Sequence, residues 1–177
     1  QCHLAEERPD RAARELRKAA ALEEGDLGLQ LELARVLVEI EPDAMSTKGT
    51  VRKVIDVAEG STEGERLLVI GQLALGVGLV EEAVDVLTRA LECGEKAHFL
   101  LGEALFRKGD AMAAHEHALR AMGDDPNDPN PHRLRARLAL KAGDRHGALA
   151  SLEAAISLDD SHAETLRLAL GTAARLD

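Results

Sequence analysis

The sequence repeats itself with a fixed period in its second half. Gly109-Asp110 and Gly143-Asp144 are 34 residues apart, and so are Ala114 and Ala148. A period in this range is typical of helical hairpins stacked in a row, because each repeat buries its apolar face only against its neighbours. The period therefore predicts an array of similar units, with no single catalytic motif at its centre.

Composition favours helices along the whole chain. The apolar residues are almost all Ala, Leu, Val and Ile, with no Trp or Tyr and two Phe among 177 residues. Ala and Leu are strong helix formers, and small side chains let helices approach closely. No run alternates apolar and polar residues over several positions, so no strand is expected. The expected fold class is all-α, a right-handed α-solenoid of antiparallel helical hairpins with about 10–11 helices.

The second helix of each repeat carries a small residue, a larger residue four positions later, and Ala three positions after that. This spacing places all three side chains on one helical stripe. The first interval between stripes is 39 residues, which we attribute to an insertion around 41–47. The five stripes are Ala12/Leu16/Ala19, Val51/Ile55/Ala58, Ala83/Leu87/Ala90, Ala114/Ala118/Ala121 and Ala148/Leu152/Ala155.

The first helix of each repeat has Gly or Ala at the point where two helices would cross most closely. Gly costs about 1 kcal/mol of helix propensity relative to Ala, so close packing is the expected reason for it. We expect burial of Gly71, Gly102, Ala136, Ala83, Ala114 and Ala148 at these crossings.

The turns carry their own signals. Gly109 and Gly143 suit a left-handed residue that ends a helix, and Asp110 and Asp144 suit the cap of the next one. Gly25-Asp26 is expected to do the same between repeats.

These features divide the chain into one repeat domain over 1–177. The expected parts are a partial repeat 1–26, repeats 27–63, 64–94, 95–128 and 129–162, and a terminal helix 163–177. The helices are expected up to Glu7 and near 9–24, 27–41, 47–59, 64–77, 80–93, 95–108, 111–123, 130–142, 145–158 and 161–175. The start resembles half a hairpin, so the chain is expected to be a fragment of a longer protein. Apolar residues at that end, Leu4, Leu16 and Leu22, predict self-association through exposed array ends.

These residues resemble the tetratricopeptide repeat (TPR) family. Leu101-Gly102, Gly109-Asp110, Ala114 and the closing Asp125-Pro126 match its pattern, best over 64–162. The chain departs from the family where bulky residues are common, because these positions hold His98, His132 and Ala118, and Asp160 replaces a closing Pro. The resemblance implies a non-enzymatic scaffold or adaptor that binds a partner peptide or domain in a concave groove lined by first helices.

The resemblance also selects the residues expected to face that groove. Arg133, Arg137 and Lys141 are spaced four apart and share a helix face, and Arg suits the capture of carboxylates. The expected partner is a protein or peptide with an apolar segment followed by acidic residues. Alternatively, such cations only solvate the helix or pair with nearby Glu. The groove set is Leu31, Arg35, Val38, Leu68, Gln72, Leu75, Phe99, Glu103, Phe106, Arg107, Arg133, Arg137, Leu140, Lys141 and Arg167.

Charge separates this hypothesis from its alternatives. The net charge is −10, and residues 1–94 carry 11 basic and 19 acidic groups, which argues against a nucleic-acid partner. A helical-repeat RNA-binding module stays open because of the basic positions from Arg133 to Arg167. A third alternative is the regulatory or oligomerisation arm of a larger enzyme. No apolar run suits a membrane span, and the default compartment is the cytoplasm.

No residue pattern indicates catalysis, a cofactor or a metal. In His115-Glu116-His117 the two histidines point to different helix faces, so we expect surface histidines. The stretch 124–128 is rich in carboxylates but lacks the Gly and closing Glu of a calcium loop. Cys2 and Cys93 have no metal-like spacing.

Overall fold

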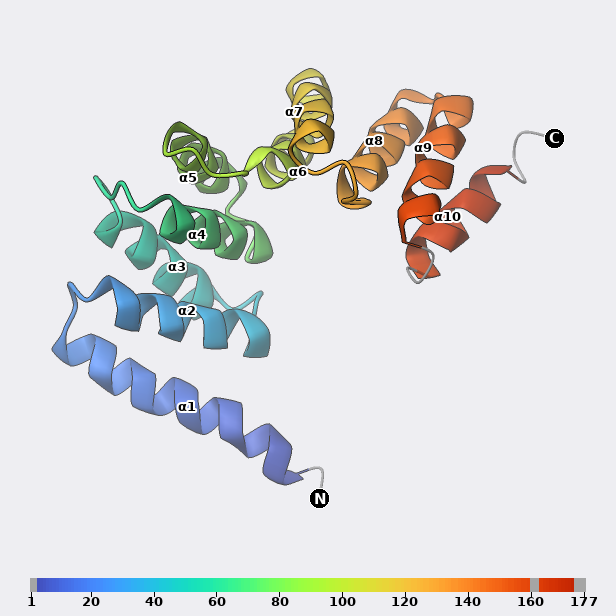
Figure 1. Ribbon diagram of the computed structural model, residues 1–177. Coiled ribbons are helices and arrows are strands. Elements are labelled where there is room, and N and C mark those ends of the chain that lie inside the picture. The colour runs from blue at the N-terminus through green and yellow to red at the C-terminus, as the bar shows by residue number, and fades with distance from the viewer. Residues whose placement is uncertain (1–2, 160–162, 174–177) are drawn as a thin grey trace. The chain divides into compact units, whose positions relative to one another are not determined.

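The computed structural model describes residues 3–159 and 163–173, and in that part of the chain it contains ten helices and no strand (Figure 1). The chain forms two compact units, unit 1 over Gln1–Glu95 and unit 2 over Lys96–Asp177. The boundary between the units lies one residue from the expected repeat boundary at 94/95.

Each unit is built from helices that pack against their neighbours in sequence. The closest packing joins α4 to α5, α6 to α7 and α8 to α9, the hairpins expected from the repeat. Unit 1 contains α1 (His3–Leu22), α2 (Leu27–Ile40), α3 (Met45–Val57), α4 (Gly64–Gly76) and α5 (Val80–Glu92). Unit 2 contains α6 (His98–Lys108), α7 (Ala111–Asp124), α8 (Asn130–Ala142), α9 (Arg145–Leu158) and α10 (Ala163–Ala173).

Small residues lie where the helices of a hairpin cross, as predicted. A Cβ atom added to Gly71 would lie 2.5 Å from the Cγ and Cδ2 atoms of Leu87 on α5. At Gly102 it would lie 3.3 Å from the carbonyl oxygen of Ala114 on α7. The six residues expected at crossings, Gly71, Gly102, Ala136, Ala83, Ala114 and Ala148, are all buried.

The Gly-Asp turns are also confirmed. Gly109 and Gly143 end α6 and α8 with φ of 99° and 80°, in the left-handed region that glycine tolerates without a Cβ clash. Asp110 accepts a hydrogen bond from the backbone N–H of Ala113, and Asp144 caps α9 in the same way. Each Gly therefore ends one helix and the following Asp begins the next.

We expect Asp110→Ala to lower the free energy of unfolding by about 1 kcal/mol. Loss of the carboxylate leaves the backbone N–H of Ala113 without its acceptor at the start of α7. Asp110→Asn is the matched control, since the Asn side-chain oxygen accepts the same bond. Urea unfolding of both variants checks this. Equal losses in the two variants would mean that the carboxylate acts through its charge and not as a cap.

Gly25-Asp26 follows this pattern only in part. Asp26 caps α2 by accepting from the backbone N–H of Leu29 at 3.0 Å. Gly25, however, is not among the positive-φ glycines. Because α1 already ends at Leu22, the chain turns instead through a hydrogen bond from the Asp26 N–H to the Glu23 carbonyl oxygen.

The beginning of the chain differs from the expectation in two ways. First, α1 continues through Pro9, where two separate helices were predicted. Proline removes only one backbone donor, and here the helix continues on both sides of it. Second, Ala12 is exposed, while Ala13 and Ala20 are buried against Leu33 and other residues of α2.

The register error in α1 has a simple cause. Alanines are adjacent at 12–13 and at 19–21, so the spacing rule fits two registers that differ by one residue. Leu16 belongs to the expected register only, but it still packs against the α2 core beside Ala13 and Ala20, so it does not add to an exposed apolar stripe. Leu22 is 85% exposed. The self-association drawn from these residues stays a prediction.

The expected insertion at 41–47 is shorter than predicted. Helix α3 begins at Met45, and Thr47 is fully buried inside it, so only 41–44 connect the two helices. Met, Ser and Thr are compatible with a first helical turn, and the buried Thr47 fixes the start of α3 against the core. Some sequence features lie outside the described residues or side chains: Cys2, Leu4, Asp160, Leu170, Ala173 and 174–177.

Candidate partner-binding surface

In unit 2 the first helices of consecutive repeats, α6 and α8, lie side by side. Nη1 of Arg137 on α8 is 2.7 and 2.9 Å from the two carboxylate oxygens of Glu103 on α6. The two residues are 34 positions apart, which is the repeat period, so they occupy the same position in neighbouring repeats. The periodic fold therefore brings the two opposite charges together.

The ring of Phe106 lies one turn further along α6 and is covered by two cations. The guanidinium carbon of Arg137 is 4.4 Å from the ring centroid, and Nζ of Lys141 is 5.2 Å from it. Both distances fall within the range of cation–π attraction. Phe106 is half-buried, so part of its surface stays accessible beside these cations.

Glu103 also forms an ion pair with a second cation, Arg107, on its own helix. Nε of Arg107 donates to its Oε1 at 3.3 Å. The side chain of Glu103 is 12% exposed, whereas those of Arg107 and Arg137 are about 40% exposed. We call Glu103, Phe106, Arg107, Arg137 and Lys141 the Phe106 cluster. It holds three cations and one carboxylate, an excess of two positive charges.

Arg133, the first residue of the predicted basic ladder, has a structural role. It donates to Asn130 at 3.0 Å and to Asp159, the cap residue at the end of α9, at 2.9 Å, and its side chain is only 17% exposed. The three cations spaced four apart thus divide. Arg133 connects α8 to the end of α9 through Asp159. Arg137 forms an ion pair with Glu103 on α6, and Lys141 is exposed.

The remaining predicted groove residues lie at different depths. In unit 2, Phe99 and Leu140 are half-buried and Arg167 on α10 is exposed. In unit 1, Leu31 and Leu75 are buried in the core with 7% and 5% exposure. The other unit 1 positions reach the surface: Val38 and Leu68 are half-buried, Gln72 is exposed, and Arg35 is exposed and pairs with Glu32 at 3.1 Å.

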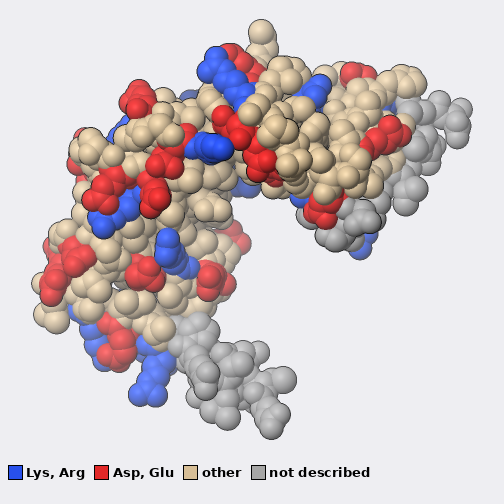
Figure 2. All heavy atoms as spheres, viewed as in Figure 1, with Lys and Arg blue, Asp and Glu red and all other residues tan. Residues whose placement is uncertain are grey.

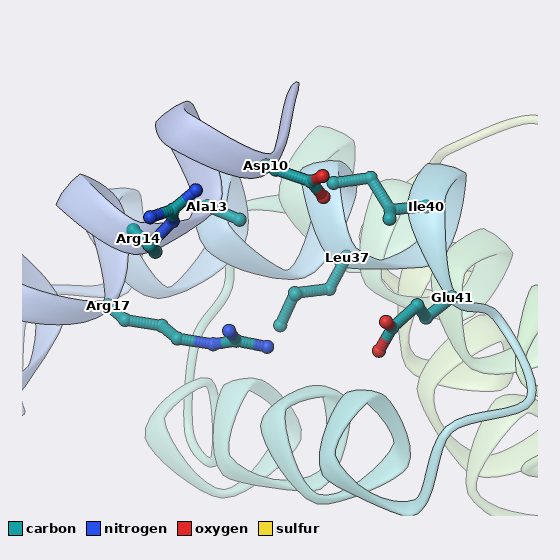
Figure 3. Close-up of a pocket in the computed structure, with 7 residues that line it drawn as sticks. All are labelled: Asp10, Ala13, Arg14, Arg17, Leu37, Ile40 and Glu41. Carbon is teal, nitrogen blue, oxygen red and sulfur yellow. The ribbon is translucent and has the colours of Figure 1, made fainter. Parts of the chain in front are cut away.

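Sequence reasoning missed a cavity of about 200 Å³ between α1 and α2 in unit 1. Figure 3 shows Arg17 extending from α1 toward Leu37 and Glu41, while Arg14 lies beside Ala13 on α1. Cations and carboxylates are equal in number in the lining, so the cavity does not favour a ligand of one charge. The lining residues are Asp10, Ala13, Arg14, Arg17, Leu37, Ile40 and Glu41.

His117 is also placed differently from the prediction. It is half-buried and its Nδ1 lies 2.9 Å from Nδ1 of His98 on α6, whereas a surface histidine was expected. His115 is exposed, as expected. The cause is that residue 98 holds a histidine where the family commonly has a bulky apolar residue, so a polar partner is available across the hairpin.

Charge is mixed on the face of the molecule drawn in Figure 2. On the face drawn in Figure 2, acidic and basic side chains are interspersed and form no broad basic area. Within the described residues no three metal-ligating side chains come together. Nor does the described part of the chain contain a helix with the length and apolar character needed to cross a membrane.

Comparison with known proteins agrees with the repeat architecture. The sequence profile of the tetratricopeptide repeat family matches residues 68–129. No curated protein matches the chain.

Several solved structures share the fold at low sequence identity. MamA from Desulfovibrio magneticus RS-1 superposes with a TM-score of 0.71 at 19% identity, covering 90% of both chains. PilW, described as a widely conserved type IV pilus biogenesis factor, gives 0.72 at 15% identity, over 98% of this chain and 87% of its own. YrrB, described as a TPR protein with an unusual peptide-binding site, gives 0.59 at 20% identity, over 92% and 84%. The chain therefore resembles the tetratricopeptide repeat family in sequence over 68–129, and its described part shares the all-α solenoid fold of these solved structures.

Proposed function

We propose that the chain is a protein-interaction scaffold, and that the Phe106 cluster binds a partner segment carrying a carboxylate beside an apolar side chain. The observation that supports this is the excess of cations around a partly accessible aromatic ring. Arginine guanidinium and lysine ammonium groups both bind carboxylates, and the ring offers apolar contact area.

Each residue of the cluster has a distinct part in this proposal. Lys141 supplies an exposed positive charge, and Arg137, which pairs with Glu103 and lies 4.4 Å from the ring centroid, supplies hydrogen-bond donors beside it. Phe106 contacts the partner's apolar side chain. Phe99 on α6 and Arg167 on α10 are proposed as further contacts, as are Arg35, Leu68 and Gln72 in unit 1.

Charge at such an exposed surface acts mainly on association rate and is screened over about 8–10 Å at physiological salt. Binding should therefore weaken as salt rises but persist, because the contact with Phe106 does not depend on ionic strength. The cations and Phe106 can therefore be distinguished by how binding depends on salt concentration.

The test uses synthetic peptides in which a Leu-Leu pair is followed by four Glu, four Gln or four Lys, titrated by fluorescence polarisation. We expect the Glu peptide to bind most tightly. Lys141→Glu should weaken its binding roughly tenfold, as for loss of a contact worth about 1.4 kcal/mol, and flatten the salt dependence. Phe106→Ala should weaken binding without changing the salt slope.

Lys108→Glu is the matched control, since it makes the same charge change at an exposed residue outside the cluster. Arg133 is unsuitable for this purpose because its replacement breaks the pair with Asp159. Equal losses for Lys141→Glu and Lys108→Glu would show only general attraction to acidic peptides. Binding that survives both Lys141→Glu and Phe106→Ala would place the site elsewhere on the chain.

A further inference from the structure

Two histidines join the helices of the hairpin that carries most of the Phe106 cluster. Nδ1 of His98 on α6 is 2.9 Å from Nδ1 of His117 on α7, and the ring centroids are 5.1 Å apart with the planes tilted by 43°. Both side chains are half-buried. A contact between two ring nitrogens at this distance requires one hydrogen, because one nitrogen must donate and the other must accept.

The pair therefore tolerates some protonation states and not others. When both rings are neutral, one Nδ1–H donates to the bare Nδ1 of its partner. When one ring is a cation, it still donates to the neutral ring. When both are cations, two N–H groups face each other at 2.9 Å and the contact becomes repulsive. The folded hairpin accepts the first proton and opposes the second, whereas an unfolded chain accepts both.

The surroundings of the pair reinforce this opposition. Burial lowers the pKa of His117, and the charges of His98 and Arg120 lower it further, while Glu116 acts in the opposite direction. Glu116 and Arg120 also pair with each other on α7 at 2.5 Å.

The third helix of this packing, α8, contains no Asp or Glu and so brings no carboxylate to the pair. It places Leu134 beside Gly102, whose added Cβ would lie 3.4 Å from the Cβ of His117. Its charged residues have other contacts. Arg135 reaches Met122 on α7, and Arg137 reaches Glu103 on α6.

We propose that the His98–His117 pair is a proton-operated latch between α6 and α7, and that mild acid opens it and releases a partner bound at the Phe106 cluster. The physical reason is that Glu103, Phe106 and Arg107 lie on α6, whose position depends on its packing against α7. The release of a partner rests on the function proposed above, but the latch itself does not.

The direction of the pH effect follows from the lowered pKa of His117. An unfolded histidine titrates near pH 6.5. Above that pH neither state protonates the ring and the stabilisation is fully present. As the pH falls below 6.5, the unfolded chain takes up a proton that the folded chain resists, so stability falls until the lowered folded pKa is reached. One such proton changes the unfolding equilibrium constant by up to about tenfold per pH unit.

The test measures the titration of each histidine by NMR in the intact chain, without a partner. We expect His117 to protonate below the ordinary range, and His98→Gln to move its titration back toward that range. The drop in stability from pH 7.5 to 5.5, measured by urea unfolding, should be smaller in His98→Gln than in the wild type. His115→Gln, on the exposed face of the same helix, should leave both results unchanged.

His132 needs a separate control, because burial also lowers its pKa and adds its own pH dependence. His132→Gln should reduce the pH slope without moving the titration of His117. If His117 titrates at the ordinary value in the wild type, the latch is overturned whether or not any variant folds. If the titrations are as expected but no acidic peptide binds at pH 7.5, the proposed binding function fails and the latch stands.

Discussion

Gly71→Ala is expected to destabilise unit 1, although this change usually stabilises a helix. An added Cβ would lie 2.5 Å from two carbon atoms of Leu87, a side chain that is completely buried. Contacts below 3.0 Å do not persist, so Leu87 or α4 has to move within a closed core. Overpacking of this kind costs about 1–3 kcal/mol, which outweighs or offsets the gain of up to about 1 kcal/mol in helix propensity.

Gly49→Ala is the control for this prediction. Gly49 lies inside α3, is exposed, and has no atom within 4 Å of an added Cβ. Here only the propensity term acts, so the variant should be more stable by up to about 1 kcal/mol. Urea unfolding should therefore move the two midpoints in opposite directions. A rise in both midpoints would mean that the α4/α5 crossing is looser than the distances indicate.

At Gly102 the space for an added Cβ is intermediate between that at Gly71 and that at Gly49. An added Cβ would lie 3.0 Å from Cδ2 of Leu134 and 3.3 Å from the Ala114 carbonyl oxygen. The leucine methyl can shift by a few tenths of an ångström, but the backbone oxygen cannot do so easily. Alanine should thus be tolerated better at 102 than at 71, whereas Gly102→Leu should cost about 1–3 kcal/mol.

The repeat spacing was sufficient to predict these crossings because it reports a backbone requirement. Only Gly or Ala allows two helices to approach closely, and the same requirement recurs in every repeat, so Gly71, Gly102 and Ala136 stand in register. The left-handed turns at Gly109 and Gly143 could be predicted for the same reason. At each of these positions only one or two residue types meet the local geometry.

Where two helix registers satisfy the same spacing, the spacing alone cannot predict which residues are buried. Adjacent alanines in α1 fit two stripes, and the choice between Ala12 and Ala13 is made by contact with Leu33 and Leu37 on α2. The expected break between a helix up to Glu7 and a helix from about residue 9 failed for a related reason. Proline favours a helix start, but it also fits within an existing helix when one lost hydrogen bond is tolerated.

The candidate site shows the same division. Spacing by four placed Arg133, Arg137 and Lys141 on one helix face, but it could not tell which of these cations is already paired. A signal was nevertheless present in the sequence. Glu103 and Arg137 are one repeat period apart and carry opposite charges, so the architecture alone indicates their contact. The Arg133–Asp159 and His98–His117 contacts join non-equivalent positions and depend on side-chain geometry.

The second large effect is expected from Arg89 on α5, which holds the end of α3. Its Nη2 donates to the carbonyl oxygens of Ala58 at 2.9 Å and Ser61 at 3.2 Å. Ala58 is the cap residue of α3. The last carbonyls of a helix have no partner within the helix, and they carry the negative end of its dipole. The Ala58 oxygen also accepts a hydrogen bond from the Ser61 N–H, so the guanidinium adds a second, charged donor there and complements the negative end of the helix dipole.

Arg89→Met keeps the aliphatic stem and removes both donors, so it isolates this role. Hydrogen bonds to charged groups contribute about 1.5–3 kcal/mol, and the half-buried setting limits replacement by water, so we expect a loss of about 2–3 kcal/mol. Arg52→Met is the control, because the Arg52–Glu82 pair joins the same two helices but is largely exposed, and exposed pairs contribute less than about 1 kcal/mol. Urea unfolding of both variants measures the difference. Similar losses would mean that water replaces Arg89 at the end of α3.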